Sequence, residues 1–284
     1  MRKVAATVSL LVTAALTACA SPNTDVEPAF SRSLPGPAAY LPRSHSHNDY
    51  DQKRPLVDAL ERGFASIEVD VMLMDGELRV GHGEEDVEPT GTLAGLYLDP
   101  LRDIARRNRG WVYAPSDPPL QLLIDVKSEA DATYRALLET LDRYADILTT
   151  WTGESPRRGP VTVVLSGNRA IGIIAGEGLR YAAIDGRIGE DRSTLSPEAM
   201  PIVSVDWEKL KPSGRTERLA TAQSLVAQLH SEGRKVRFWG TPEREDLWRS
   251  LVAMDVDYIG TDDVGRLDRL LRAVGNANPR PIDD

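Results

Sequence analysis

Glu68 and Asp70 lie two residues apart within residues 66–71, where polar and apolar residues alternate in the pattern of a β-strand. Side chains at positions i and i+2 of a strand share one face, so we expect both carboxylates to point one way and the apolar residues the other. Neighbouring carboxylates repel each other unless a cation lies between them, and hard divalent cations prefer oxygen ligands. The pair therefore predicts a site for one Ca²⁺ or Mg²⁺ ion, since all-oxygen ligands disfavour Zn²⁺.

Two histidines flank this pair in the sequence: His47, followed directly by Asn48, and His82. Imidazoles on either side of such an ion could act as acid and base in an in-line displacement at phosphorus. The residues leave open which histidine has which role, and whether water or a substrate hydroxyl attacks. His45 shares a strand face with His47, and it either shares the site or orients His47; we do not expect it to act as an acid or base.

The elements that must position these residues alternate, from residue 43 onward, between short strand-like runs and segments of helical periodicity. The expected strands are 43–48, 66–74 with 77–82, 120–127, 161–167, 181–187, 202–207, 235–241 and 257–262. The expected helices are 55–63, 92–108, 130–150, 168–178, 216–233, 242–255 and 264–274, with an irregular connection over 188–201. Eight strands with intervening helices predict an α/β protein with a single (β/α)8 barrel. An open doubly wound sheet is the alternative, but no glycine-rich phosphate loop follows the first strand.

In such a barrel, polar residues at the carboxyl ends of the strands form the site. Alternate positions predict inward-facing polar residues on six of the eight expected strands: His45, His47, Glu68, Asp70, His82, Asp125, Lys127, Asp185, Arg187, Ser204, Asp206, Arg237 and Trp239. Arg187 and Arg237 are expected to contact a phosphate charge, and Trp239 either to contact substrate or to pack in the barrel. Asp262 either completes the ring or belongs to the capping turn of the last helix. The segment 166–168 is expected to be a strand-to-helix cap without a chemical role.

Several segments resemble the phospholipase C-like phosphodiesterase superfamily and, within it, the altered inheritance of mitochondria protein 6 family. They are His45-Ser46-His47-Asn48-Asp49-Tyr50, Ile67-Glu68-Val69-Asp70-Val71, Asp75-Gly76-Glu77-Leu78, Val80-Gly81-His82, Thr92-Leu93, Leu96-Tyr97-Leu98-Asp99-Pro100-Leu101, Leu123-Ile124-Asp125-Val126-Lys127, Arg237-Phe238-Trp239, Thr241-Pro242 and Thr261-Asp262-Asp263. Their order and spacing cover most of residues 44–263. The superfamily includes glycerophosphodiester phosphodiesterases and phosphoinositide phospholipases C, so the resemblance implies a (β/α)8 barrel and phosphoric diester hydrolase activity.

The resemblance also implies roles for single residues. His47 and His82 match the two catalytic histidines, and Lys127 matches a basic residue near the phosphate. The implied metal ligands are Asn48, Glu68, Asp70 and Asp125. The family often has Glu at the last of these positions, so direct coordination by the shorter Asp125 and coordination through a water both stay open.

We therefore expect a metal-dependent hydrolase that acts on a glycerophosphodiester or phospholipid-type substrate by His/His acid–base catalysis. The alternatives are a phosphoinositide-type phospholipase C and a non-catalytic ligand-binding lipoprotein that retains the barrel. The presence of both histidines favours an enzyme over the binding lipoprotein. Glu68→Gln or Asp70→Asn is expected to abolish activity and leave the fold intact.

The amino terminus has the pattern of a lipoprotein signal peptide over residues 1–18. Arg2 and Lys3 precede an apolar stretch, and Leu16-Thr17-Ala18-Cys19 resembles the bacterial lipoprotein cleavage box. The only cysteine, Cys19, is expected to carry the lipid. Residues 19–42 are expected to be a flexible tether, 43–275 the barrel and 276–284 a disordered tail. We expect an exported cell-membrane lipoprotein that faces the extracellular or periplasmic side.

Charge limits the expected partners. The formal net charge is −9, and loss of Arg2 and Lys3 with the signal peptide would make it about −11. Such a charge argues against nucleic-acid binding and against adsorption to anionic lipid. The expected partners are the phosphodiester or phospholipid substrate and a membrane reached through the lipid anchor, and we expect a monomer.

Overall fold

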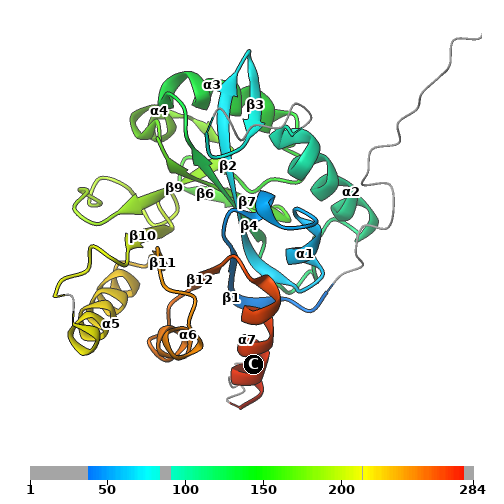
Figure 1. The fold of residues 1–284 in the computed structure, drawn as a ribbon. Helices are drawn as coiled ribbons and strands as arrows, with labels where there is room; N and C mark the ends of the chain where they lie inside the picture. The colour runs from blue at the N-terminus through cyan, green and yellow to red at the C-terminus, as the bar shows by residue number, and fades with distance from the viewer. Residues whose placement is uncertain (1–37, 84–90, 213, 278–284) are drawn as a thin grey trace, which may run out of the picture. The chain divides into compact units, whose positions relative to one another are not determined.

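Eight parallel strands close into a ring in the computed structural model, which describes residues 38–83, 91–212 and 214–277 (Figure 1). The strands are β1 (Leu41–Ser46), β2 (Phe64–Met74), β4 (Leu120–Val126), β7 (Val161–Gly167), β9 (Ala182–Arg187), β10 (Ile202–Asp206), β11 (Lys235–Trp239) and β12 (Tyr258–Thr261). Each strand pairs with the next along the chain, and Ser46 of β1 lies opposite Ile67 of β2 and Thr261 of β12. The predicted barrel is therefore confirmed, because an open sheet would leave β1 and β12 unpaired with each other.

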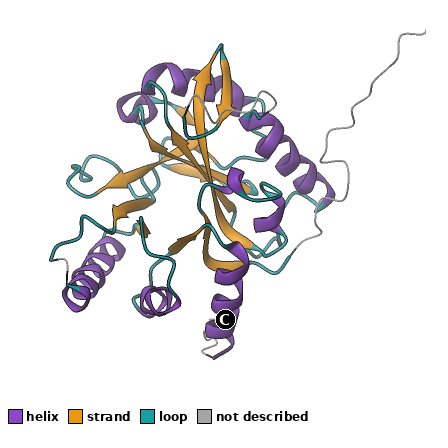
Figure 2. Ribbon diagram, in the orientation of Figure 1, coloured by secondary structure: helices purple, strands orange, loops and turns teal. Residues whose placement is uncertain are grey.

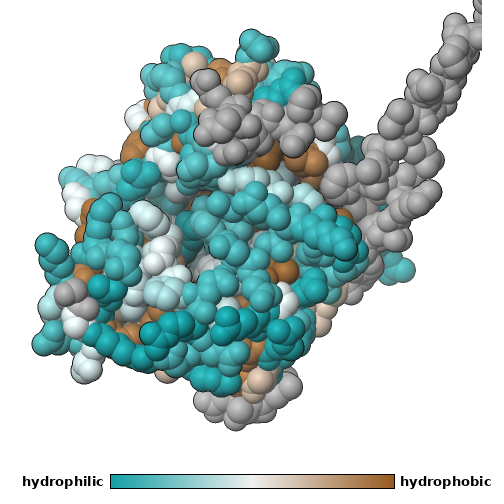
Figure 3. All heavy atoms as spheres, in the orientation of Figure 1, coloured by the Kyte–Doolittle hydropathy of each residue, from teal (hydrophilic) through white to brown (hydrophobic). Residues whose placement is uncertain are grey.

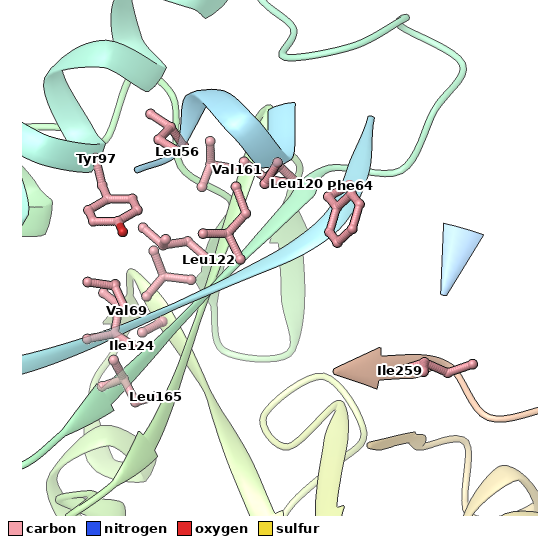
Figure 4. Close-up of a cluster of buried hydrophobic side chains, with 14 of the residues drawn as sticks. Leu56, Phe64, Val69, Tyr97, Leu120, Leu122, Ile124, Val161, Leu165 and Ile259 are labelled. Atoms are coloured by element: carbon pink, nitrogen blue, oxygen red, sulfur yellow. The ribbon is translucent and has the colours of Figure 1, made fainter. Parts of the chain in front are cut away.

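The two faces of the strands bury different side chains. Val69, Ile124 and Leu165 are register neighbours on β2, β4 and β7, and they lie side by side in the main apolar cluster (Figure 4). The opposite face carries a second apolar cluster, which includes Leu123 and Val164. These two residues precede the polar Asp125 and Ser166 by two positions, so the barrel interior is apolar at one level and polar at the next.

Helices lie outside the strands (Figure 2). They are α1 (Val57–Leu60), α2 (Asp99–Arg107), α3 (Ala130–Asp142), α4 (Ile171–Gly176), α5 (Arg215–Ser231), α6 (Glu245–Ala253) and α7 (Val264–Ala277). A 3-10 turn, η2 (Asp49–Asp51), follows β1, and a π-helical turn, η4 (Ala94–Leu98), precedes α2. The one connection between barrel strands that we expected to be irregular, residues 188–201, has no helix. Buried Arg234 donates hydrogen bonds to the carbonyl oxygens of Arg192, Leu195 and Met200, and so holds this connection in place.

The helix predicted over residues 130–150 is too long. It ends at Asp142, and a small antiparallel sheet of β5 (Thr150–Thr152), β6 (Ser155–Arg157) and β8 (Leu179–Arg180) begins soon after. Trp151 of β5 is buried with the interior cluster of the barrel, and residues 147–149 exchange backbone hydrogen bonds with Val161. Burial of Trp151 and this pairing override the local helical periodicity.

The hairpin formed by β2 and β3 (Glu77–Val80) extends beyond the barrel. Asp75 and Gly76 both have positive φ angles, of 50° and 79°, between the paired residues Met74 and Glu77. Two such residues make the turn that matches the twist of paired strands. The chain therefore reverses and returns toward the barrel just before His82.

The described barrel extends slightly beyond its predicted limits of 43–275, because β1 begins at Leu41 and α7 ends at Ala277. The predicted signal peptide, Cys19, most of the tether and the end of the tail lie outside the described residues. Within the described part, no helix is both long and apolar enough to cross a membrane. The face in Figure 3 is mostly hydrophilic, in keeping with the 27% of charged residues in the sequence.

Candidate active site

Three carboxylates meet at the carboxyl ends of β2 and β4. Asp70 and Asp125 are register partners, and with Glu68 they place one ligand atom each within 4.8 Å of the others. Asp70 Oδ1 and Asp125 Oδ1 are buried and have no hydrogen-bond partner among the described residues. Buried carboxylate oxygens are nearly always paired. Three clustered carboxylates with two unpaired oxygens therefore fit a hard divalent cation.

Lys127 reduces the repulsion between these carboxylates. Its Nζ lies 3.2 Å from Asp70 Oδ2 and 3.0 Å from Asp125 Oδ2. Burial raises the pKa of Asp125, and the charges of Asp70 and Glu68 raise it further against the opposing effect of Lys127. Lys127 was expected near the phosphate. It lines the cavity described below, and its ammonium group pairs with both aspartates.

Glu68 is held by side chains from β11 and from the neighbouring strand β1. Its Oε2 accepts hydrogen bonds from Arg237, at 2.5 Å, and from His45 Nε2, at 2.8 Å. Burial opposes ionisation of Glu68, but Arg237 and the hydrogen bond with His45 outweigh it and hold the pKa well below its usual value. Arg237 was expected as a phosphate contact. It is only 3% exposed, and its guanidinium supports Glu68 through their hydrogen bond.

His45 contacts the acidic cluster and not His47. It bonds Glu68 through Nε2 and Ser66 Oγ through Nδ1, at 2.8 Å, rather than orienting His47. Burial and the charge of Arg237 lower the pKa of His45 to about 4. A neutral ring that donates from Nε2 and accepts at Nδ1 satisfies both contacts. His45 is therefore a support for Glu68.

Each of the two candidate catalytic histidines has a carboxylate at its Nδ1 atom. His47 follows β1, where its backbone N–H bonds Thr261, and its Nδ1 lies 2.7 Å from Asp262 Oδ1. His82 Nδ1 lies 2.8 Å from Asp70 Oδ2, because the β2–β3 hairpin brings it back beside β2. A carboxylate at Nδ1 favours the tautomer that leaves Nε2 free to accept a proton. Neither Nε2 has a partner among the residues that the structure describes.

The environment of His47 favours the charged ring. Burial by itself lowers the pKa of His47, but the hydrogen bond that its Nδ1 donates to Asp262 and the charge of Glu68 outweigh it, so that the pKa is raised. Asp262 was expected either to complete the ring of polar residues or to belong to the capping turn of the last helix. In the structure it pairs with His47. The capping part belongs to its neighbour Asp263, whose Oδ1 accepts the Arg266 N–H at 2.9 Å at the start of α7.

A cavity of about 810 Å³ opens at this end of the barrel. Nine predicted site residues line it: His47, Asn48, Glu68, His82, Asp125, Lys127, Arg187, Arg237 and Trp239. Asp70 is fully buried and contacts His82 and Lys127. Asn48 has a left-handed backbone, with φ 41° and ψ 53°. Of the predicted site residues, only Cys19 lies outside the described part of the chain.

Some supporting residues were missed from the sequence. Tyr50 donates a hydrogen bond to Asp70 Oδ2 at 2.9 Å, and buried Asp49 accepts from Ser46, Leu56 and Tyr97. Asp49 thereby fixes the loop that carries His47 and Asn48. The signal was present, because both residues belong to the motif at 45–50, but no local rule connects Tyr50 with a carboxylate on another strand.

The prediction for the segment 166–168 is wrong. It does not cap a helix, because α4 begins at Ile171 after Ala170, which makes no side-chain cap. Instead, Ser166 bonds Asp185, and Asn168 bonds the Ser128 carbonyl at 3.0 Å. A Cβ atom on Gly167 would lie 1.9 Å from Asp125 Oδ1, so the bare glycine leaves room for that carboxylate. The segment therefore shapes the acidic cluster.

Taken together, these contacts suit transfer at a phosphoryl group. Three carboxylates can hold a cation, and two imidazoles with carboxylates at Nδ1 line the same cavity. The cation site and proton-transfer groups that such a reaction needs are thus adjacent.

Comparison with known proteins also points to a phosphodiesterase family. The AIM6-like phosphodiesterase domain matches residues 40–182, and the glycerophosphoryl diester phosphodiesterase family matches residues 235–265. Altered inheritance of mitochondria protein 6 of Eremothecium gossypii is 32% identical over 267 residues, which cover 79% of this chain and 68% of that protein. The homologue from Arthroderma benhamiae is 30% identical over 255 residues, which cover 78% of this chain and 81% of that protein.

Among solved structures, a glycerophosphodiester phosphodiesterase from Parabacteroides distasonis is similar, with a TM-score of 0.53 and 16% sequence identity. The similarity covers 84% of this chain and 100% of that chain. At this identity the comparison supports the barrel fold alone.

Proposed function

Because this chain belongs to the AIM6-like phosphodiesterase domain family, we propose that it hydrolyses glycerophosphodiesters or phospholipid-type diesters with one divalent cation and two catalytic histidines. The observation that carries the proposal is the placement of His47 and His82 at one cavity with the carboxylates Glu68, Asp70 and Asp125. A barrel that bound a ligand without turnover would have no need of two imidazoles with carboxylates at Nδ1.

In the proposed mechanism, Glu68, Asp70, Asp125 and Asn48 would hold the cation, which would supply positive charge against the charge that develops on the phosphoryl oxygens. One histidine accepts the proton of the attacking hydroxyl at Nε2. The other donates a proton to the leaving alkoxide, and water or a substrate hydroxyl is the nucleophile. Asp262 stabilises the charged form of His47, and Asp70 orients His82.

The first test uses a dialkyl phosphodiester in which one alkyl group has a free hydroxyl next to the ester oxygen, and an alkyl p-nitrophenyl phosphodiester with the same hydroxyl, with purified protein in Mg²⁺ or Ca²⁺. Hydrolysis should require the cation, stop with excess chelator and return when the cation is restored. Detection of the phosphorus product by NMR distinguishes direct hydrolysis from a cyclic phosphate. Binding of both diesters without any turnover in either cation would refute the enzymatic proposal and favour a binding protein.

The second test separates the two histidines. His47→Ala and His82→Ala should each lower turnover of the dialkyl diester by at least about 10²-fold. Nitrophenolate needs little protonation, so the nitrophenyl diester should rescue only the variant that lost the acid. His230→Ala is a matched control, because His230 also pairs with an aspartate, Asp257, at 2.8 Å, but does not line the cavity. Near-normal turnover by either cavity variant would refute the pairing.

Its location is part of the same proposal. We propose that the chain is exported and anchored in a cell membrane through lipid on Cys19, with the barrel facing the extracellular or periplasmic side. The support is the sequence from Leu16 to Cys19 alone. Cys19→Ser should move the protein from the membrane fraction of a bacterial host to the soluble fraction, or block its processing. A wild-type protein found only in the soluble fraction would contradict the anchor.

A further inference from the structure

The carboxylate beside His47 belongs to an exposed residue. The side chain of Asp262 is 72% exposed, and its only hydrogen-bond partner among the described residues is His47. An exposed side chain loses rotamer freedom when a single contact fixes it, and this loss opposes a constant orientation. The placement of the Asp262 carboxylate therefore depends on how firmly its backbone is held.

Both backbone polar groups of Asp262 are hydrogen-bonded to side chains. Its N–H donates to Glu243 Oε1 at 2.6 Å, and its carbonyl oxygen accepts from Gln52 Nε2 at 2.8 Å. Glu243 lies in the loop between β11 and α6, whereas Gln52 follows the η2 turn after β1. Asp262 is thus held from two different loops.

Glu243 has a second contact on the same segment. Its Oε1 also accepts from Thr261 Oγ1 at 2.7 Å, and Thr261 is the buried last residue of β12. The carbonyl oxygen of Thr261 accepts the backbone N–H of His47 at 3.1 Å. One oxygen of Glu243 therefore fixes both residues that contact His47, Thr261 at its backbone and Asp262 at its ring.

The surroundings of Glu243 give its carboxylate no other task. It forms no ion pair and no helix cap within the described part of the chain, where its contacts are Thr261 and Asp262. It is not among the residues that line the cavity, so it does not face the substrate. Its own backbone is held on α7, because its carbonyl oxygen accepts from Arg266 at 3.2 Å. Glu243 can therefore act on the site only through the end of β12.

We propose that Glu243 is a positioning residue, which holds Asp262 where its carboxylate orients His47 for proton transfer. The inference rests on the proposed role of His47 in phosphodiester hydrolysis and extends it to a residue outside the cavity. Glu243 supplies an acceptor oxygen at a fixed distance from the backbone, and an amide oxygen accepts as a carboxylate oxygen does. The length of this side chain, rather than its charge, is thus the property that matters.

The first measurement is turnover of the dialkyl phosphodiester described above, in Mg²⁺ or Ca²⁺. Glu243→Ala should lower kcat by about tenfold with little change in KM, because loss of a group that orients a functional side chain has effects of this order. Glu245→Ala is the matched control, since Glu245 lies nearby and bonds Arg266 at 3.4 Å, but does not contact Asp262. It should keep the wild-type kcat. Equal kcat for wild type and Glu243→Ala would overturn the proposal.

Two conservative variants separate length from charge. Glu243→Gln keeps an acceptor oxygen at the same distance and should retain the wild-type kcat. Glu243→Asp keeps the charge but has a shorter side chain, so it should lose as much kcat as Glu243→Ala, and it replaces that variant if the alanine protein does not fold. Full activity of Glu243→Asp together with loss in Glu243→Gln would indicate an effect of charge and refute the inference.

A double variant tests the path through Asp262. Asp262→Ala combined with Glu243→Ala should have the kcat of Asp262→Ala alone, because residues that act through one contact have non-additive effects. Independent losses that multiply in the double variant would contradict this path.

Ring ¹⁵N NMR of the histidines gives a readout that needs no turnover. The chain has four histidines, and His47→Ala identifies the signals of His47. The neutral ring of His47 should carry its proton on Nδ1 in the wild type, and Glu243→Ala and Glu243→Asp should reduce this tautomer to the level of Asp262→Ala. An unchanged tautomer in both folded variants would overturn the inference. The expected tautomer changes without any hydrolysis would support positioning by Glu243 and count against the proposed function alone.

Discussion

At the scale of single residues, the candidate histidines depend on the carboxylates at Nδ1. His82 uses Asp70, which is fully buried and belongs to the acidic cluster, whereas His47 uses Asp262, whose side chain is 72% exposed. Removing Asp70 would disturb the candidate cation site and the histidine together. Asp262 contacts His47 without being part of that cluster, so it isolates the effect of orienting an imidazole.

We predict that Asp262→Ala lowers kcat by about tenfold, because loss of a partner that orients a functional imidazole has effects of this order. KM should change little, and the pH dependence of kcat should shift with the loss of the carboxylate beside His47. Asp263→Ala is the control: it should lower the free energy of unfolding by about 1 kcal/mol, as loss of a helix N-cap does, and keep kcat. Equal kcat for wild type and Asp262→Ala would contradict the orienting role.

At the scale of elements, the end of β7 decides where Asp125 on β4 can lie. Gly167 has a φ angle of 67°, and it is the residue that approaches Asp125 Oδ1. Val126 and Gly167 are register partners, so the close approach is built into the pairing of β4 with β7. The last residue of β7 thus limits the space for a carboxylate on the neighbouring strand β4.

We predict that Gly167→Ala weakens Mg²⁺ or Ca²⁺ binding by at least about tenfold, since loss of the outer contacts of a ligand has effects of this order. Gly153→Ala is a matched control, because Gly153 has a φ angle of 59° and a Cβ atom there would meet nothing within 4 Å. Both variants should lose about 1–3 kcal/mol of stability from the strained backbone. Gly167→Ala should lose more than Gly153→Ala, because its Cβ atom would also lie 2.4 Å from the Val126 carbonyl oxygen. Calorimetric titration should find weaker binding only in the first, and equal affinities would contradict the steric argument.

At the scale of the whole molecule, the buried charges connect strands that are distant in sequence. Glu68 on β2 and Arg237 on β11 are 169 residues apart, and both side chains are 4% exposed. The three clustered carboxylates repel one another, while this pair is attractive. The pairing of Glu68 with Arg237 therefore stabilises the barrel, whereas the repulsion among the three clustered carboxylates destabilises it.

We predict that Glu68→Gln lowers the free energy of unfolding by about 3 kcal/mol in excess chelator, because it leaves Arg237 as a buried cation without its anion. This revises the expectation from the sequence that the change leaves the fold intact. Asp125→Asn, the control within the cluster, removes repulsion and should be neutral or stabilising under the same conditions. Urea denaturation measures both, and equal effects of the two substitutions would contradict the assignment of Arg237.

Added cation gives an independent check at this scale. A ligand that binds only the folded state raises the melting temperature. Mg²⁺ or Ca²⁺ should therefore stabilise the wild type and should have little effect on Asp125→Asn, as measured by calorimetry.

Local patterns were enough to predict the barrel, most of its strands to within about two residues, and the inward face that carries Glu68, Asp70 and Asp125. These features follow from the two-residue period of a strand, which any short segment displays by itself. The same period placed Asp185 and Ser204 on the inward face. It could not show that both residues line one cavity with Arg237.

Only the tertiary structure decided the partners: Arg237 and His45 on Glu68, Asp262 on His47, and Gly167 against Asp125. Each contact joins different strands or the ends of two strands, and its geometry depends on how the ring closes and how far neighbouring strands are staggered. A sequence determines which side chains face inward, because that is a property of one strand. Which of them meet is a property of the closed barrel.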